Sequence, residues 1–263
     1  SLLKVHPENN TIDTDTGTLS YDYLVLALGT QTNYFGMESV RQKSLPMKTI
    51  DEALSLRNHL LLNMEKVVRM QHTSRRDGLL NVVIAGGGAT GVELAGMLAE
   101  LGSYIAAKEY LEIKDFRSHL YLVNSGPVLL GPMSATAQVE AEKVLRKLGV
   151  NIILNAAVKD YINGKVILSD GREIETEALI WATGVIAREV PGLPEEVITR
   201  GRRLMVDEYN KVIGQSNIYA LGDLCFQTTD ANYPEGHPQL AQVAIQQGKL
   251  LAKNFIHIQQ KRP

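Results

Sequence analysis

Three glycines that directly follow a mainly apolar run constrain this chain more than any other feature. The run is 79–85, and the glycines follow it as Gly86-x-Gly88-x-x-Gly91. Such a run is typical of a strand buried on both faces of a parallel sheet. Helical periodicity that starts at about Thr90 completes a strand, a glycine loop and a helix. This is the context in which the pattern binds a dinucleotide.

Each glycine has its own mechanical role in such a loop. Gly86 allows the tight turn, Gly88 lets the main chain approach a pyrophosphate, and Gly91 lets the helix pack closely against the strand. The N–H groups and partial positive charge at the helix N-terminus then stabilise the phosphates. The alternative is a glycine-rich turn without a ligand, and the flanking strand and helix favour the dinucleotide.

The residues after this loop predict a nucleotide-binding α/β domain. Strands and an amphipathic helix alternate along it, and a small antiparallel meander with Asn-Gly and Asp-Gly turns is inserted before the last strand. We expect the strands at 120–123, 150–154 and 178–182, the helix at 134–148, and the meander at 158–162, 165–168 and 172–174.

The residue that follows the expected strand at 120–123 determines how the protein would bind the adenosine ribose. An acidic residue there binds the 2′-hydroxyl of NAD, but this chain has Asn124. An asparagine still forms a hydrogen bond to a ribose, although it discriminates less against a 2′-phosphate. No arginine lies in the next several residues to favour NADP, so NADH is the predicted substrate.

The residues before the glycine loop predict a first segment with its own elements. We expect a strand at 2–5, a hairpin at 11–19 and a strand at 23–28 that is buried on both faces. Thr49 and Glu52 have the spacing of a capping box, which predicts a helix N-terminus. Leu54, Leu61, Met64 and Val68 then recur at helical intervals. Polar residues at 71–78 are interpreted as a linker and a domain boundary.

A second ligand signal lies late in the chain. Residues 218–221 predict a short strand that ends in Gly222-Asp223. This places a carboxylate at the carboxyl edge of a sheet, where ligands of α/β proteins bind. An ordinary turn aspartate is the alternative. One long helix is expected at 238–258.

Composition excludes several classes of protein. The formal net charge is −2 and the basic residues are scattered, which argues against nucleic-acid binding. The single cysteine, Cys225, cannot form a disulfide framework or a multi-cysteine metal site, which favours a reducing compartment. The six histidines have no metal-ligand spacing, so no metal site is predicted. No apolar run reaches the length of a membrane span, and no signal peptide is expected.

These motifs together resemble the two-dinucleotide-binding flavoprotein superfamily, and within it type II NADH dehydrogenase, the NADH:quinone oxidoreductases. The resemblance covers essentially the whole chain, and its most specific part is similar to the quinone-site helix of that family. The matching stretches are 21–30, 86–96, 181–184, 218–223 and 239–248.

The resemblance implies an α/β fold of two Rossmann-like three-layer domains that bind FAD and NAD(P). The expected boundaries are 1–77 for the first part of an FAD-binding domain, 78–185 for an NAD(P)H-binding domain, and 186–263 for the second part of the FAD-binding domain. The FAD domain is expected to be incomplete, because no second glycine fingerprint exists and the membrane-anchoring C-terminal helices of the family are not found. The chain is therefore interpreted as shortened at both ends, with weak or no FAD binding of its own.

The resemblance also implies roles for individual residues. Gly29, Gly222 and Asp223 would bind FAD, and Thr183 and Gly184 would border the nicotinamide dinucleotide. Gln242 and Gln246, at i and i+4 on one helix face, would contact the quinone, because neutral amides suit quinone carbonyls; a solvated polar stripe is the alternative.

Two further residues matter in the family. Glu93 would relay protons between the nicotinamide and quinone sides, or it would only interact with the helix dipole in the first helical turn. Cys225 matches a Gly-Asp-x-Cys ending and is interpreted as a buried inert thiol, because it has no partner cysteine.

The implied activity is hydride transfer from NADH to FAD and electron transfer on to a quinone. The alternatives are a reductase of a soluble acceptor such as ferredoxin or rubredoxin, and a non-catalytic NAD-binding module. The expected setting is the cytoplasm, with the parent protein peripheral on the cytoplasmic face of the inner membrane. The membrane surface would be reached only through the missing C-terminal segment, and a homodimer is an assembly that the resemblance allows.

Overall fold

A five-stranded parallel sheet underlies the glycine loop, and its strand order is β6-β13-β7-β8-β9. Each neighbouring pair is parallel, with Ala85 of β7 opposite both Trp181 of β13 and Val123 of β8. All residues of β7 and β13 are buried, which explains why both segments are apolar without alternation. The strands are β6 (Leu45–Pro46), β7 (Val82–Ala85), β8 (Leu120–Val123), β9 (Asn151–Ile153) and β13 (Ala178–Trp181).

The two faces of this sheet belong to two different cores. Ile84 and Ile180 pack with the helices, whereas Val83 and Leu179 pack with an antiparallel meander. Successive strand residues point to opposite faces, so this division follows the two-residue period of a strand. The result is three layers: helices, parallel sheet and meander. The helices are α2 (Ile50–Arg69), α3 (Ser74–Leu80), α4 (Ala89–Glu109) and α5 (Ala135–Lys147), and the meander is β10 (Val158–Ile162), β11 (Lys165–Leu168) and β12 (Glu173–Glu175).

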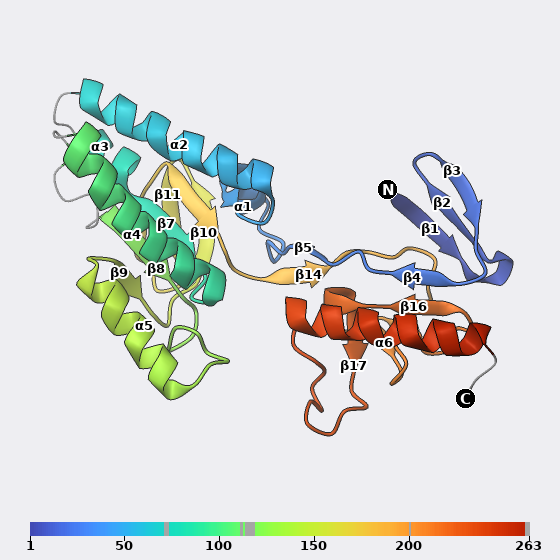
Figure 1. Ribbon diagram of the computed structural model, residues 1–263. Coiled ribbons are helices and arrows are strands. Elements are labelled where there is room, and N and C mark those ends of the chain that lie inside the picture. Colours follow the sequence, from blue (N-terminus) through green and yellow to red (C-terminus); the bar gives the residue numbers. More distant parts are fainter. Residues whose placement is uncertain (71–73, 111–112, 114–118, 200, 261–263) are drawn as a thin grey trace. The chain divides into compact units, whose positions relative to one another are not determined.

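The computed structural model describes residues 1–70, 74–110, 113, 119–199 and 201–260 (Figure 1). The chain divides into two units. The central unit, Thr32–Gly184, contains the five-stranded sheet, and the split unit consists of Ser1–Gln31 and Val185–Pro263. The chain passes between them at β5 (Thr30–Thr32) and directly before β14 (Val185–Ala187).

The first domain boundary therefore differs from the predicted one at 77–78. Residues 32–77 belong to the central unit because β6 pairs with β13 and because Leu56 and Leu60 of α2 lie in the helix-side core. The predicted linker is also wrong where it is described: α3 begins at Ser74, and Arg76 is buried. The predicted linker segment has the polar composition of a linker. The carbonyl of Gly78 nevertheless accepts a hydrogen bond from the main chain of Glu177. Residues 71–73 lie outside the described residues.

Helix α2 begins where the sequence predicts, but it buries a different stripe. Thr49 accepts from the N–H of Glu52, and the Glu52 carboxylate accepts from the N–H of Thr49, which confirms the capping box. The residues buried in α2 are Leu56, Leu60, Asn63, Met64 and Val67. Of the predicted stripe only Met64 is buried, and Leu54 is exposed. Because α2 is apolar on more than one face, its periodicity does not fix which face packs.

The split unit has its own core, formed by short paired strands. Val5, Leu26 and Ile218 contribute to it, together with the buried Cys225. The strands form an antiparallel sheet β1-β2-β3 and two parallel pairs, β16-β4 and β15-β17. The bounds are β1 (Leu2–His6), β2 (Thr11–Thr14), β3 (Gly17–Ser20), β4 (Leu24–Leu26), β15 (Leu204–Val206), β16 (Ile218–Ala220) and β17 (Cys225–Gln227).

Strand β4 is buried on one face only, so the predicted burial on both faces is wrong. Leu24 and Leu26 face the core, but Val25 is 38% exposed and Tyr23 is 50% exposed. The described pairing of β4 is to β16 alone. Tyr23, which directly precedes β4, contacts Phe255 of α6 (Ala241–Gln259), with ring centroids 5.3 Å apart. The other helices among the described residues are α1 (Glu38–Lys43) and the short 3-10 helices η1 (Pro7–Asn9), η3 (Glu195–Val197) and η4 (Gly222–Leu224).

Helix α6 is amphipathic and begins three residues later than predicted, with Leu240 as its N-cap. Gln247 and Leu251 are its buried residues, and it packs against η4. No helix among the described residues is both long and apolar enough to span a bilayer.

Candidate functional site

The carboxyl ends of three adjacent strands meet at the glycine loop. The N–H of Gly86 donates to the carbonyl of Val123 over 2.8 Å, and the N–H of Ala182 donates to that of Ala85 over 2.9 Å. The loop after β7 is therefore joined to the ends of β8 and β13. In open parallel sheets ligands bind at this edge.

Gly86 has two structural reasons to be glycine. Its φ of +115° lies in the region that favours glycine. A β-carbon there would also lie 2.7 Å from the carbonyl oxygen of Ala182 and 3.0 Å from the Cα of Thr183. Gly86 thus allows the turn, as the sequence predicts, and also lets the loop lie against the end of β13.

Gly91 brings helix and loop together. A β-carbon on Gly91 would overlap the carbonyl oxygen of Gly86. The first turn of α4 consequently packs directly on the loop. This is the close approach of helix and strand that the third glycine of the fingerprint permits.

Gly88, in contrast, faces open space. Apart from its chain neighbours, no described atom lies within 4 Å of the position that its β-carbon would occupy. Gly88 is the N-cap of α4, is exposed, and has no side-chain cap among the described residues. The first N–H groups of a helix lack intrahelical partners. The arrangement provides an uncapped, uncrowded helix N-terminus that suits a phosphate group.

Asn124 lies beside the loop, and its amide already has partners there. Its Oδ1 accepts from the N–H of Gly87 at 3.1 Å. Its Nδ2 donates to the carbonyl of Val128 at 2.8 Å and to that of Gly126 at 3.3 Å. Asn124 therefore fixes the glycine loop to the 124–128 turn. The sequence predicts a ribose contact for Asn124, and no local pattern indicates this bond to Gly87.

Thr183 and Gly184 lie at the same edge, where the structure adds two residues that the sequence did not predict. Gly184 has a φ of +71°, and a β-carbon there would meet the ring of Phe35 at 2.5 Å. Asn33 donates from its N–H to the carbonyl of Gly184, and its own carbonyl accepts from Nε1 of Trp181 at 2.9 Å. Since Asn33 and Trp181 are 148 residues apart, no local pattern could have revealed this contact.

Glu93 lies one residue further into α4 than predicted, just beyond the first turn. The helix begins at Ala89, so Glu93 is its fifth residue, and the first turn contains no acidic side chain. The influence of the helix dipole decreases beyond the first turn, which weakens the purely electrostatic explanation. The Glu93 side chain is exposed.

A second group of predicted residues gathers in the split unit. β4 and β16 are parallel, and the N–H of Leu221 donates to the carbonyl of Leu26 over 3.0 Å. Gly29 and Gly222 follow these two strands with φ values of +66° and +65°. Asp223 follows in η4 and is half-buried. Two adjacent strand ends thus present two turning glycines and one carboxylate.

Helix α6 places Gln242 and Gln246 on its exposed surface. Gln247, which is not among the predicted site residues, is 6% exposed. Its Oε1 accepts from the N–H of Gly222 at 2.8 Å and lies 3.4 Å from Sγ of Cys225. Burial raises the pKa of the Cys225 thiol, and the hydrogen bond to Gln247 opposes that change. This agrees with a protonated, inert thiol.

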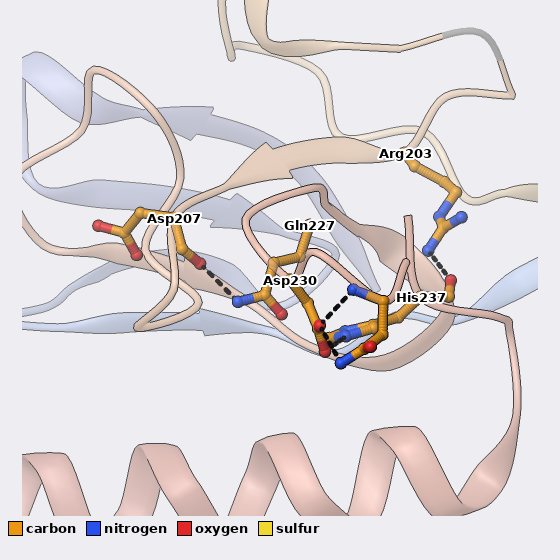
Figure 2. Close-up of polar contacts among 6 residues, drawn as sticks. Arg203, Asp207, Gln227, Asp230 and His237 are labelled. Carbon is orange, nitrogen blue, oxygen red and sulfur yellow. Dashed lines mark hydrogen bonds and ion pairs between the residues drawn. The ribbon is translucent and has the colours of Figure 1, made fainter. Parts of the chain in front are cut away.

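The loop before α6 is held by a cluster of polar contacts (Figure 2). Nη2 of Arg203 donates to the carbonyl of His237 at 2.9 Å, and Nε donates to that of Cys225 at 2.8 Å. Asp230 interacts with Nε2 of His237 at 3.1 Å, and this bond lowers the pKa of Asp230. Gln227 donates to the carbonyl of Asp207 at 3.3 Å. These contacts fix the loop that leads into the N-terminus of α6.

The predicted site residues therefore fall into two groups. Gly86, Gly88, Gly91, Asn124, Thr183 and Gly184 meet at one sheet edge of the central unit, and Glu93 follows on α4. Gly29, Gly222, Asp223, Gln242 and Gln246 belong to the split unit.

Comparison with known proteins gives a consistent result. A family model described as pyridine nucleotide-disulphide oxidoreductase matches residues 3–248. The chain is 32% identical over 243 residues to the type II NADH:quinone oxidoreductase Ndh of Mycobacterium tuberculosis, covering 89% of this chain and 51% of that protein. It is 31% identical over 236 residues to the mitochondrial internal alternative NAD(P)H-ubiquinone oxidoreductase A1 of Solanum tuberosum, covering 89% of this chain and 46% of that protein.

A solved structure is similar as well. The structure of NDH2 from Plasmodium falciparum in complex with NADH has a TM-score of 0.78 and 25% sequence identity, and the match covers 87% of this chain and 50% of that chain. The chain thus spans about half the length of the relatives that it matches.

Proposed function

The chain belongs to the pyridine nucleotide-disulphide oxidoreductase family, and on that premise we propose that it serves in a flavin-dependent NADH:quinone oxidoreductase. In this proposal the central unit is the NAD(P)H-binding domain and the split unit contributes to the FAD-binding domain. Relatives named as NADH:quinone oxidoreductases support it, because they match nearly nine tenths of the chain.

The open position at Gly88 is the observation that carries the proposal. Two glycines of the loop are needed to pack the protein against itself, since β-carbons there would collide with the main chain of Ala182 and of Gly86. Gly88 has no such neighbour, so its missing side chain leaves room for a ligand. A pyrophosphate fits this space, because it is anionic and the helix N-terminus offers N–H donors.

The split unit suits part of a flavin site. When bound, FAD supplies hydride acceptance from NADH and electron transfer to the acceptor. Gly29 has open space above its Cα, so a ligand can approach the main chain after β4. The half-buried Asp223 would hold hydroxyl groups of the ribityl and pyrophosphate region, because a carboxylate accepts hydrogen bonds from hydroxyls.

The exposed amides of α6 suit the acceptor. Gln242 and Gln246 lie one turn apart on the helix, and their N–H groups would donate to quinone carbonyl oxygens. The Glu93 carboxylate would carry a proton, since reduction of a quinone to a quinol takes up protons.

A membrane-dissolved acceptor places the enzyme at a membrane surface, which we propose to be the cytoplasmic face of the inner membrane. A homodimer stays a prediction.

Separate titrations with NADH and NADPH by calorimetry test the site that carries the proposal. We expect saturable binding of NADH to the chain, with weaker binding of NADPH. Absence of binding by both nucleotides would overturn the assignment. In a flavin-loaded protein, NADH oxidation coupled to a quinone rather than to ferredoxin or rubredoxin would separate the proposed acceptor from the soluble alternative.

A further inference from the structure

One glutamine of α6 is buried, although the glutamine directly before it is exposed. Gln246 faces solvent, whereas the adjacent Gln247 is 6% exposed. The Oε1 of Gln247 is shared by two donors, the N–H of Gly222 at 2.8 Å and the thiol of Cys225 at 3.4 Å. Its Nε2 is buried without a partner among the described residues. Among the described residues, the Gln247 side chain therefore forms its hydrogen bonds through Oε1 and not through Nε2.

A second glutamine holds the other end of the same dipeptide. Nε2 of Gln239 donates to the main-chain carbonyl of Asp223 at 3.0 Å. Thus Gln247 binds the N–H at the start of Gly222-Asp223, and Gln239 binds the carbonyl at its end. Gln239 precedes α6 and Gln247 lies within it, so both bonds join this dipeptide to the same helical segment.

Direct packing allows no gap between helix and dipeptide. A β-carbon on Gly222 would lie 3.1 Å from the β-carbon of Ala244, and the φ of Gly222 is +65°. The main chain of Gly222 therefore lies against α6, between the two glutamine contacts. A rotation of α6 about its axis would break the bond from Gln247 and would also move Gln242 and Gln246.

We propose that Gln247 and Gln239 are positioning residues that clamp Gly222-Asp223 onto α6, so that the Asp223 carboxylate and the exposed amides of Gln242 and Gln246 form one rigid unit. The link to the flavin and the acceptor rests on the proposed function; the clamp itself does not. The four glutamines of this segment thus have two roles: two bind the main chain of the turn, and two face the acceptor.

The single cysteine makes the clamp measurable without any cofactor. Cys225 is 1% exposed and shares Oε1 with Gly222, so its modification rate by a thiol reagent reports opening of this contact. Leucine is similar in shape to glutamine but offers no acceptor. In the chain as it is, Gln247→Leu is expected to speed Cys225 modification and Gly222 amide exchange at least about tenfold. Gln247→Glu, which keeps an oxygen there, should restore most of the protection at mildly acidic pH.

Three further variants and measurements complete the test. Lys249→Leu alters an exposed residue of α6 and should leave both rates unchanged. Gln239→Leu removes only the bond to Asp223 and provides a second route if Gln247→Leu does not fold. In FAD-loaded protein, Gln247→Leu should weaken FAD binding about tenfold and shift the flavin absorption spectrum.

The outcomes separate the clamp from the proposed function. Unchanged modification and exchange rates in both leucine variants would overturn the clamp. Faster rates with unaltered FAD affinity and spectrum would overturn its role in orienting Asp223. If Asp223→Asn leaves the FAD affinity of the flavin-loaded protein unchanged, the flavin assignment of Asp223 fails and the orienting role fails with it, whereas the thiol and amide rates still decide whether the clamp exists.

Discussion

The carbonyl oxygen of Gly86 occupies the position that a β-carbon on Gly91 would need. The first turn of α4 is thereby packed on the loop after β7, and the two glycines act together. Gly88, between them, has open space instead. One motif therefore combines two glycines required for packing with one that leaves room for a ligand.

This difference predicts opposite effects for two matched substitutions. Gly91→Ala should destabilise the protein by about 1–3 kcal/mol, because the added methyl group overlaps main chain that cannot move aside. Gly88→Ala should change the unfolding free energy by less than about 1 kcal/mol, since its φ of −76° is accessible to alanine. It should nevertheless weaken NADH binding, because the methyl group lies where the pyrophosphate is proposed. Thermal unfolding and NADH calorimetry measure the two effects, and equal NADH affinity in Gly88→Ala would contradict the site.

Asn124 predicts a change in nucleotide preference. In Asn124→Asp a carboxylate oxygen replaces Nδ2 and cannot donate to the carbonyls of Val128 and Gly126. The carboxylate would be free to accept from a ribose hydroxyl and would repel a 2′-phosphate. We expect the ratio of NADPH affinity to NADH affinity to decrease roughly tenfold, together with a loss of about 1–3 kcal/mol of stability. Calorimetry with each nucleotide checks the ratio, and an unchanged ratio would place the ribose elsewhere.

The exposed position of Gln246 predicts a functional effect without a structural one. Gln246→Leu should leave the unfolding free energy within about 0.5 kcal/mol of the original value, because the side chain is exposed. In flavin-loaded enzyme, the KM for quinone should rise roughly tenfold through the lost donor, with NADH affinity unaltered. Steady-state kinetics with varied quinone provide the measurement. Unaltered quinone kinetics would leave Gln246 as part of a solvated stripe.

The Asp230–His237 pair predicts an acid-sensitive loop. The hydrogen bond to His237 lowers the pKa of Asp230 below its ordinary value of 3.8. A lowered carboxyl pKa contributes stability that is complete above the ordinary value and is lost as the pH falls through the lowered value. Amide exchange in the loop that carries Asp230 and His237 should therefore accelerate below about pH 4. In Asp230→Asn this added acceleration should disappear, and an identical pH profile for both proteins would exclude the pair as its cause.

Much of the fold could be predicted because local patterns determine it. The apolar runs of β7 and β13, the capping box of Thr49 and Glu52, and the Asn163-Gly164 turn each act over a few residues. The turn residues have φ values of +51° and +72°, as a tight hairpin with Asn-Gly requires. The glycine fingerprint is local in the same sense, so its strand, loop and helix were predicted. The strand nevertheless begins at Val82 and not at Leu79, because residues 79–80 form the end of α3.

Other features could not be predicted, because they depend on contacts between distant segments. Helix α2 is apolar on several faces, and only its packing against the sheet selects Leu56 and Leu60 over Leu54. The polar stretch that contains Arg76 resembles a linker until Gly78 bonds to Glu177. The amide of Asn124 suits a ribose until the Gly87 main chain is beside it.

The sequence by itself determined the nucleotide-binding α/β class, the three glycines and the family, because strand burial and glycine spacing are properties of short segments. Only the tertiary structure decided that Gly88 alone of the three has space for a ligand, and that Gln247 rather than Gln246 binds the Gly-Asp turn. The sequence alone does not show which of the adjacent residues Gln246 and Gln247 is buried. They differ once the helix packs, because residues about 100° apart around its axis face solvent and core respectively.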